Sequence, residues 1–128
     1  MKLLLDTHIF IWWADEPEKL SPVALSALED EKNSLILSVA SVWEIQIKSQ
    51  LGKLTLSQPL KEVIESQQAI NDLQVLPIEL THALALDSLP LHHKDPFDRL
   101  LIAQSIVEDV TLVTADNKLS AYPAKLLR

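Results

Sequence analysis

Short apolar runs alternate along the chain with longer segments in which apolar residues recur every three or four positions. Four of the runs are rich in Leu, Ile and Val and too brief for helices, which predicts buried strands. They lie at residues 2–5, 34–37, 73–76 and 110–113. The periodic segments predict helices, which lie at residues 9–14, 22–30, 39–51, 59–70, 80–86, 95–108 and 116–122.

Residues at the ends of these segments support the predicted boundaries. Ser21 stands before Pro22, as an N-cap stands before a proline in the first helical turn. Asp95 stands before Pro96 in the same way. Gly52, the one glycine in the chain, follows the third predicted helix, where a C-terminus favours glycine.

Strands that alternate with helices predict a parallel sheet covered on both faces. A length of 128 residues is close to that of one average domain. We therefore expect an α/β fold, a three-layer α/β/α arrangement of four or five parallel strands, as a single domain over residues 1–128. The helix at 95–108 is expected to bury four apolar residues, Leu100, Leu101, Ile106 and Val107.

Composition and charge exclude several classes of functional site and partner. The absence of cysteine excludes disulfide scaffolds and thiolate metal sites, and a single glycine excludes glycine-rich phosphate loops. The 18 acidic residues outnumber the 11 basic ones, and a net charge of −7 weighs against binding nucleic acid through a basic face. No apolar stretch approaches the ~20 residues of a membrane span. We expect no signal peptide, because Met1-Lys2 leads directly into the first predicted strand and Asp6. We expect a cytoplasmic protein with no membrane partner.

Acidic residues follow the predicted strands or open the helices beside them, at the edge of a parallel sheet where ligands bind. The principal ones are Asp6, Glu44, Asp98 and Asp116. Each has an ordinary explanation at a helix N-terminus, such as capping by Asp6 or the capping-box spacing of Ser41 and Glu44. Glu79 also follows a strand, and spacing alone leaves open which acids converge.

Several carboxylates at one edge would repel one another, by roughly 4 kcal/mol for two charges ~4 Å apart at an effective dielectric of 20. Such a cluster favours a hard divalent cation, because Mg²⁺ and Mn²⁺ prefer oxygen ligands. Ions of this kind suit phosphoryl chemistry, since they generate a nucleophilic water and stabilise the leaving oxygen.

Four stretches carry a family likeness, in order along the chain: LLLDTH at 3–8, SVASVWEI at 38–45, LHHKDPFDRLLIAQ at 91–104 and LVTAD at 112–116. Together they resemble the PIN-domain nucleases, and within these the VapC-type toxins of prokaryotic toxin–antitoxin pairs. The resemblance implies a PIN-like fold and a metal-dependent endoribonuclease. It implies that Asp6, Glu44 and Asp98 hold one or two Mg²⁺ or Mn²⁺ ions, assisted by Asp116, while a metal-activated water attacks RNA. Asp95 is then a helix cap, and a small antitoxin is a partner.

Some residues outside the quartet have competing explanations. Lys48, Lys94 and Arg99 are candidates for phosphate contacts, although Lys48 also lies four residues after Glu44, where a helix-face ion pair would form. Trp43 is a candidate for stacking on bases. We expect loop or surface roles for four residues, His8, His82, His92 and His93.

Two further expectations concern assembly and an alternative function. Trp12 and Trp13 and the apolar helix at 21–28 predict a homodimer. The alternative is a receiver-like, Mg²⁺-binding phosphoacceptor module without catalysis. Such a module needs adjacent acids after the first strand and an aspartate after the third. Here Asp6 stands alone, and the third strand is followed by Pro77-Ile78.

Overall fold

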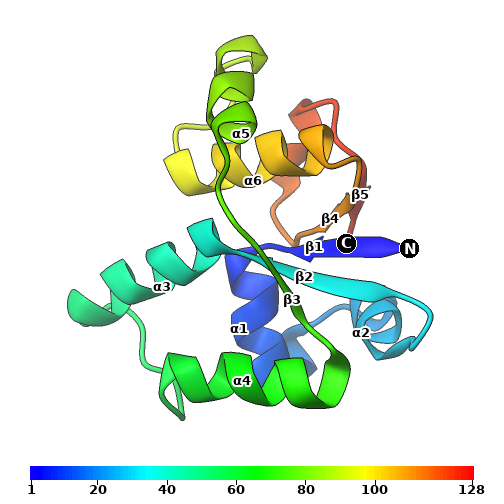
Figure 1. The fold of residues 1–128 in the computed structure, drawn as a ribbon, viewed down its shortest axis with the longest axis vertical. Helices are drawn as coiled ribbons and strands as arrows, with labels where there is room; N and C mark the ends of the chain where they lie inside the picture. The colour runs from blue at the N-terminus through cyan, green and yellow to red at the C-terminus, as the bar shows by residue number, and fades with distance from the viewer.

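The structure is a computed structural model that describes residues 1–128 (Figure 1). Its strands are β1 (Lys2–Leu5), β2 (Ser34–Ser38), β3 (Gln74–Leu76), β4 (Thr111–Val113) and β5 (Leu126–Leu127). Its α-helices are α1 (Thr7–Asp15), α2 (Pro22–Glu29), α3 (Val39–Gln50), α4 (Leu60–Asn71), α5 (Leu80–Ala85) and α6 (Pro96–Val107). Short 3₁₀-helices are η1 (Pro17–Lys19), η2 (Leu86–Ser88) and η3 (Asn117–Ala121).

All five strands form one parallel sheet in the order β3-β2-β1-β4-β5. The central strand is β1, whose Leu4 lies opposite Ile36 of β2 and Leu112 of β4. The chain builds outward from β1 to β3 and then returns to the other side of β1. The carboxyl ends of β1 and β4 therefore flank the point at which sheets of this kind bind ligands.

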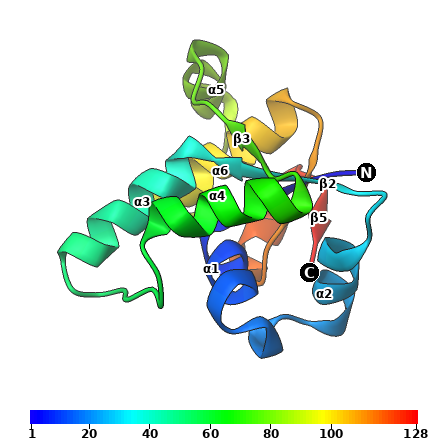
Figure 2. The ribbon, with the colours of Figure 1, turned by 60° about the horizontal axis from the view of Figure 1, so that its bottom comes forward.

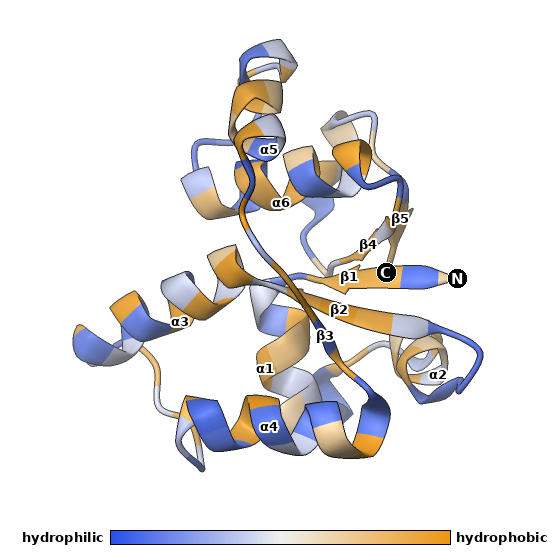
Figure 3. Ribbon diagram, viewed as in Figure 1, coloured by the Kyte–Doolittle hydropathy of each residue, from blue (hydrophilic) through white to orange (hydrophobic).

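Helices cover both faces of the sheet, as the alternating pattern predicts. Helices α5 and α6 lie over one face, and α1, α2 and α4 lie over the other (Figures 1 and 2). Leu3 and Leu5 pack with Phe10 of α1, whereas Leu4 points the other way and packs with Leu101 of α6. The ribbons of β1 and β2 are accordingly apolar along most of their length (Figure 3). The three-layer α/β/α prediction is confirmed.

Some elements differ from the prediction in detail. Residues 116–122 give the 3₁₀-helix η3 in place of an α-helix, and β5, only two residues long, pairs with β4 at the sheet edge. Ile106 and Val107 are each 40% exposed and not buried as expected. The face of α6 that packs on the sheet runs through Leu101, Ile102 and Ser105, and Ile106 and Val107 point away from it. No helix has the length and apolar character needed to cross a membrane.

The ends of the helices follow the predicted capping chemistry with one exception. Asp95 accepts hydrogen bonds from the N–H groups of Phe97 and Asp98, which caps α6. Helix α3 is capped by Ser38, so Ser41 lies inside the helix and does not form a capping box with Glu44. Beyond α3, Gly52 has a φ of +72°, the left-handed conformation that glycine adopts without strain.

Candidate active site

Asp6 stands at the carboxyl end of the central strand with only 5% of its surface exposed. Its side chain caps α1 by accepting the N–H of Ile9 at 2.8 Å, and the side chain of Thr114, after β4, also donates to it. Burial nevertheless raises the pKa of Asp6, and the nearby charge of Glu44 adds to the rise. The fold thus keeps a carboxyl group at the ligand-binding edge despite an electrostatic cost.

Both oxygens of Glu44 are held by neighbouring side chains. The hydroxyl of Thr7 donates to Oε1 at 2.6 Å, and Lys48 Nζ donates to Oε2 at 2.6 Å. The helix-face pair considered for Lys48 is therefore formed, and the hydrogen bond to Glu44 raises the pKa of Lys48. Thr7 is buried and contacts Ser41 as well, so it orients the carboxylate and is not a helix cap.

Asp98 and Asp116 come together through His93. The Nε2 atom of His93 lies 3.0 Å from Oδ2 of Asp98 and 3.2 Å from Oδ2 of Asp116. Burial, followed by the charges of Asp95 and Glu44, raises the pKa of Asp98 to about 7. Burial also acts to raise the pKa of Asp116, but hydrogen bonds from the Lys118 N–H and from His93 outweigh it and leave that pKa lowered.

The structure therefore brings the four predicted acids to one edge of the sheet. Asp6 and Glu44 are close enough to Asp98 for their charges to raise its pKa, and His93 joins Asp98 to Asp116. Asp6, Asp95 and Asp116 cap helices, as local explanations predict, but Asp98 does not. Capping leaves the cost of placing Asp98 among other carboxylates unexplained.

His93 is the site residue that the sequence reasoning missed. It lies in a loop, as expected, but its ring is half-buried between two carboxylates and not on the open surface. No spacing rule connects a histidine with acids 5 and 23 residues further along the chain. His93 meets both carboxylates only because the fold packs α6, which carries Asp98, beside the turn between β4 and η3, which carries Asp116.

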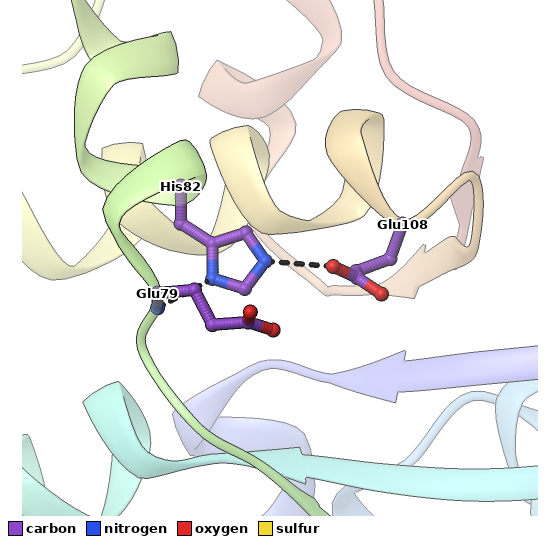
Figure 4. A group of neighbouring side chains, drawn as sticks. All are labelled: Glu79, His82 and Glu108. Carbon is purple, nitrogen blue, oxygen red and sulfur yellow. Dashed lines mark hydrogen bonds and ion pairs between the residues drawn. The ribbon is translucent and has the colours of Figure 1, made fainter.

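A second histidine–carboxylate group lies apart from this site, where α5 meets the end of α6 (Figure 4). His82 is fully buried, so the expected surface role is wrong. Its Nδ1 accepts the N–H of Glu79 at 3.0 Å, and its Nε2 lies 2.8 Å from Oε2 of Glu108. Because Nδ1 is an acceptor, the neutral ring carries its proton on Nε2, which leaves no lone pair there for a metal ion. The group locks α5 onto α6, and Glu79 does not join the acidic quartet.

The donors at the first site suit a hard cation. Asp6, Glu44, Asp98 and Asp116 present carboxylate oxygens, and the pKa values of Asp6 and Asp98 are raised first by burial and then by neighbouring carboxylates. Mg²⁺ and Mn²⁺ bind such oxygen donors, and a divalent charge would relieve the repulsion among them. The residues present therefore fit such an ion.

Comparison with known proteins gives the family. Residues 3–125 match the family described as PIN domain. The chain belongs to the PIN-domain family. This PIN domain is 30% identical over 122 residues to Ribonuclease VapC22 of Mycobacterium tuberculosis, an alignment that covers 94% of this chain and 91% of the relative.

Solved structures share the fold of this PIN domain at low sequence identity. VapBC2 from Rickettsia felis, solved bound to a DNA fragment from its promoter, matches with a TM-score of 0.71 at 20% identity and covers 99% of this chain and 98% of its own. FitAcB from Neisseria gonorrhoeae matches with a TM-score of 0.63 at 18% identity, covering 98% of this chain and 96% of its own. These likenesses establish that the sheet and helices follow the PIN arrangement.

Proposed function

We propose that this PIN domain is a metal-dependent endoribonuclease that hydrolyses RNA phosphodiester bonds as the toxin of a toxin–antitoxin pair. The observation that carries the proposal is the gathering of Asp6, Glu44 and Asp98 at the carboxyl edge of the sheet. Family membership and the identity to a ribonuclease over most of the chain support it. The receiver-like alternative lacks a phosphoacceptor after β3, because Glu79, the acid nearest there, lies beside His82 and Glu108.

The proposed cofactor is Mg²⁺ or Mn²⁺, held by Asp6, Glu44 and Asp98 with help from Asp116. Such an ion supplies an activated water and neutralises charge on the phosphodiester. The chain itself supplies positioning and electrostatics. Thr7 and Lys48 hold the two oxygens of Glu44. Asp95 fixes the start of α6, and with it Asp98.

RNA is the proposed substrate, and two features beside the acids suit it. Trp43, directly before Glu44, is 56% exposed and packs edge-to-face on Phe97, directly before Asp98, with ring centroids 5.2 Å apart. An exposed indole there offers a stacking surface to an unpaired base. Lys94 is exposed and available to phosphates, whereas Arg99 donates to backbone carbonyls of Leu86 and Leu89.

The proposal includes a homodimer, a small antitoxin and a cytoplasmic location. Trp12 and Trp13 are half-buried against the core, so the apolar surface that remains lies elsewhere. On α2 the one exposed large apolar residue is Val23, and three exposed leucines on or after α5 add to the apolar surface, Leu80, Leu84 and Leu91. Several solved neighbours are VapBC toxin–antitoxin structures. An antitoxin arginine is a suitable inhibitor, because a guanidinium pairs with carboxylates in a fork.

Cleavage assays test the enzymatic proposal. Purified protein is incubated with structured and unstructured RNAs in Mg²⁺, Mn²⁺ or EDTA, and we expect cleavage only with metal. Asp6→Asn, Glu44→Gln and Asp98→Asn should each reduce the rate by at least about 100-fold. Asp95→Asn is the matched control and should retain most activity, because asparagine caps helices nearly as well as aspartate. Undiminished cleavage in EDTA would contradict the proposal, as would an inactive Asp95→Asn beside an active Asp98→Asn.

Assembly and toxicity need separate measurements. Sedimentation at micromolar concentration should give a dimer. Expression of the chain should slow growth, and co-expression of an adjacent antitoxin gene should restore it. A monomer would contradict the proposed homodimer, and growth unaffected by the chain alone would contradict the proposed toxicity.

A further inference from the structure

His93 is fixed in the site from two sides. Its backbone N–H donates to the hydroxyl of Tyr122 at 2.9 Å, and Tyr122 is itself buried. Its ring nitrogen Nδ1 accepts the N–H of Asp95 at 3.2 Å. The loop before α6 and the end of η3 therefore hold the ring with Nε2 toward Asp98 and Asp116.

These contacts determine where the proton of the neutral ring lies. A backbone N–H can only donate, so Nδ1 of His93 accepts and Nε2 carries the hydrogen. That N–H donates to Oδ2 of Asp116 at 3.2 Å, and Oδ2 of Asp98 lies 3.0 Å from the same nitrogen as a close electrostatic contact without hydrogen-bond geometry. Nε2 then has no lone pair for a cation, although the three residues together have the spacing of a metal-binding group.

Oδ1 of Asp116 already accepts the N–H of Lys118 at 2.9 Å, so Oδ2, which His93 contacts, is the oxygen of Asp116 left for a divalent cation. The Nε2–H of His93 and such a cation both carry positive charge, and both interact with carboxylate lone pairs, so they compete for Oδ2 of Asp98 and Oδ2 of Asp116. They cannot share them fully, so binding of the ion to both carboxylates requires the hydrogen bond from His93 to Asp116 and its close contact with Asp98 to weaken or break.

We propose, building on the metal-dependent function proposed above, that His93 is a positioning residue that holds Asp98 and Asp116 together in the metal-free protein and is displaced from them when the cation binds. The ring acts as an internal placeholder. It keeps two mutually repelling carboxylates at a fixed spacing, and so presents the cation with an assembled pair. The affinity for metal is correspondingly lower than the carboxylates alone would give.

Metal affinity distinguishes a placeholder from a ligand by the sign of the change. We expect His93→Ala to bind Mn²⁺ about tenfold more tightly by isothermal titration calorimetry without RNA, since the lost hydrogen bond to Asp116 and the lost contact with Asp98 no longer compete. His93→Gln, whose amide N–H can reach the same oxygens, should stay within about threefold of wild type. His92→Ala is the matched control, because His92 is exposed and its ring lies against Tyr122, and it should leave the affinity unchanged.

The ring can also be observed directly, which keeps the proposal testable if His93→Ala folds poorly. Nitrogen NMR of the metal-free wild type should show His93 with its proton on Nε2. Addition of diamagnetic Mg²⁺ should shift this signal while the proton stays on Nε2. A ring protonated on Nδ1, or an Nε2 that loses its proton and coordinates the ion, would overturn the proposal.

The outcomes separate this inference from the function on which it rests. If the wild type binds no Mn²⁺, the metal-dependent function fails, and the placeholder role fails with it. If the wild type binds Mn²⁺ but His93→Ala binds it equally or more weakly, the placeholder role alone is overturned.

Discussion

Replacement of Asp98 by asparagine is expected to stabilise the metal-free protein, and the gain should grow with pH. The pKa of Asp98 is raised from 3.8 to about 7 because the carboxyl is buried near Asp95 and Glu44. Between these values the unfolded chain releases a proton that the folded protein keeps, so this group lowers the free energy of unfolding as pH rises. Above pH 7 the loss is complete. Asparagine has no proton to release, so the variant escapes this loss.

The size of the effect follows from the shift. A difference of roughly three pKa units corresponds to about 4 kcal/mol at pH 8 if felt in full. The Asp98 side chain is 20% exposed, and water screens part of the interaction. We therefore expect a gain of about 1–2 kcal/mol at pH 8, or a melting temperature higher by about 4–8 °C. At pH 5.5 the gain should be roughly half as large, because this pH lies about midway between the pKa of Asp98 in the unfolded chain, 3.8, and its raised pKa in the folded protein, about 7.

Thermal and urea unfolding in EDTA at pH 5.5 and pH 8 measure this gain. Asp87→Asn is the matched control, because Asp87 is exposed in η2, and its stability difference from wild type should be small at both pH values. A gain for Asp98→Asn that is equal at the two pH values would refute the electrostatic reasoning. So would a loss of stability at pH 8.

Three other expected outcomes test separate features. Mn²⁺ at a hundred times its dissociation constant should raise the unfolding free energy of wild type by about 2.7 kcal/mol, and Asp98→Asn should lose most of this gain in thermal melts. Thr7→Val should lower the urea-unfolding free energy by about 1–3 kcal/mol, because Oε1 of buried Glu44 loses its donor, whereas Thr7→Ser should restore most of it. Gly52→Ala should cost about 1 kcal/mol from its positive φ alone, since a Cβ there meets nothing within 4 Å, and a much larger loss would show an unrecognised contact.

The fold was predictable because its signals are local. Apolar runs such as residues 34–37 are short and buried on both faces, and Ser21 and Asp95 cap helices through their own neighbours. Strand β5 was not predicted, because a strand of two leucines is too short to show an alternating or continuous apolar pattern. The exposure of Ile106 depends on how α6 is rotated against the sheet, which its own sequence does not specify.

The acids of the site were predictable for a related reason, because carboxyl ends of parallel strands meet at one edge. Their partners were not. His93 and Lys48 acquire their roles from how α3, α6 and the turn after β4 pack together. Likewise, His82 is buried only because α5 packs against α6.

The order in which the strands are synthesised differs from their order in the sheet. The central strand β1 is made first, yet its neighbour β4 begins at Thr111, and Asp116 follows later still. A nascent chain thus carries Asp6 and Glu44 long before Asp98 and Asp116 can join them. During that interval one edge of β1 has no partner and is open to pairing with other chains. A chain that ends before β4 is therefore expected to have no nuclease activity and a tendency to aggregate.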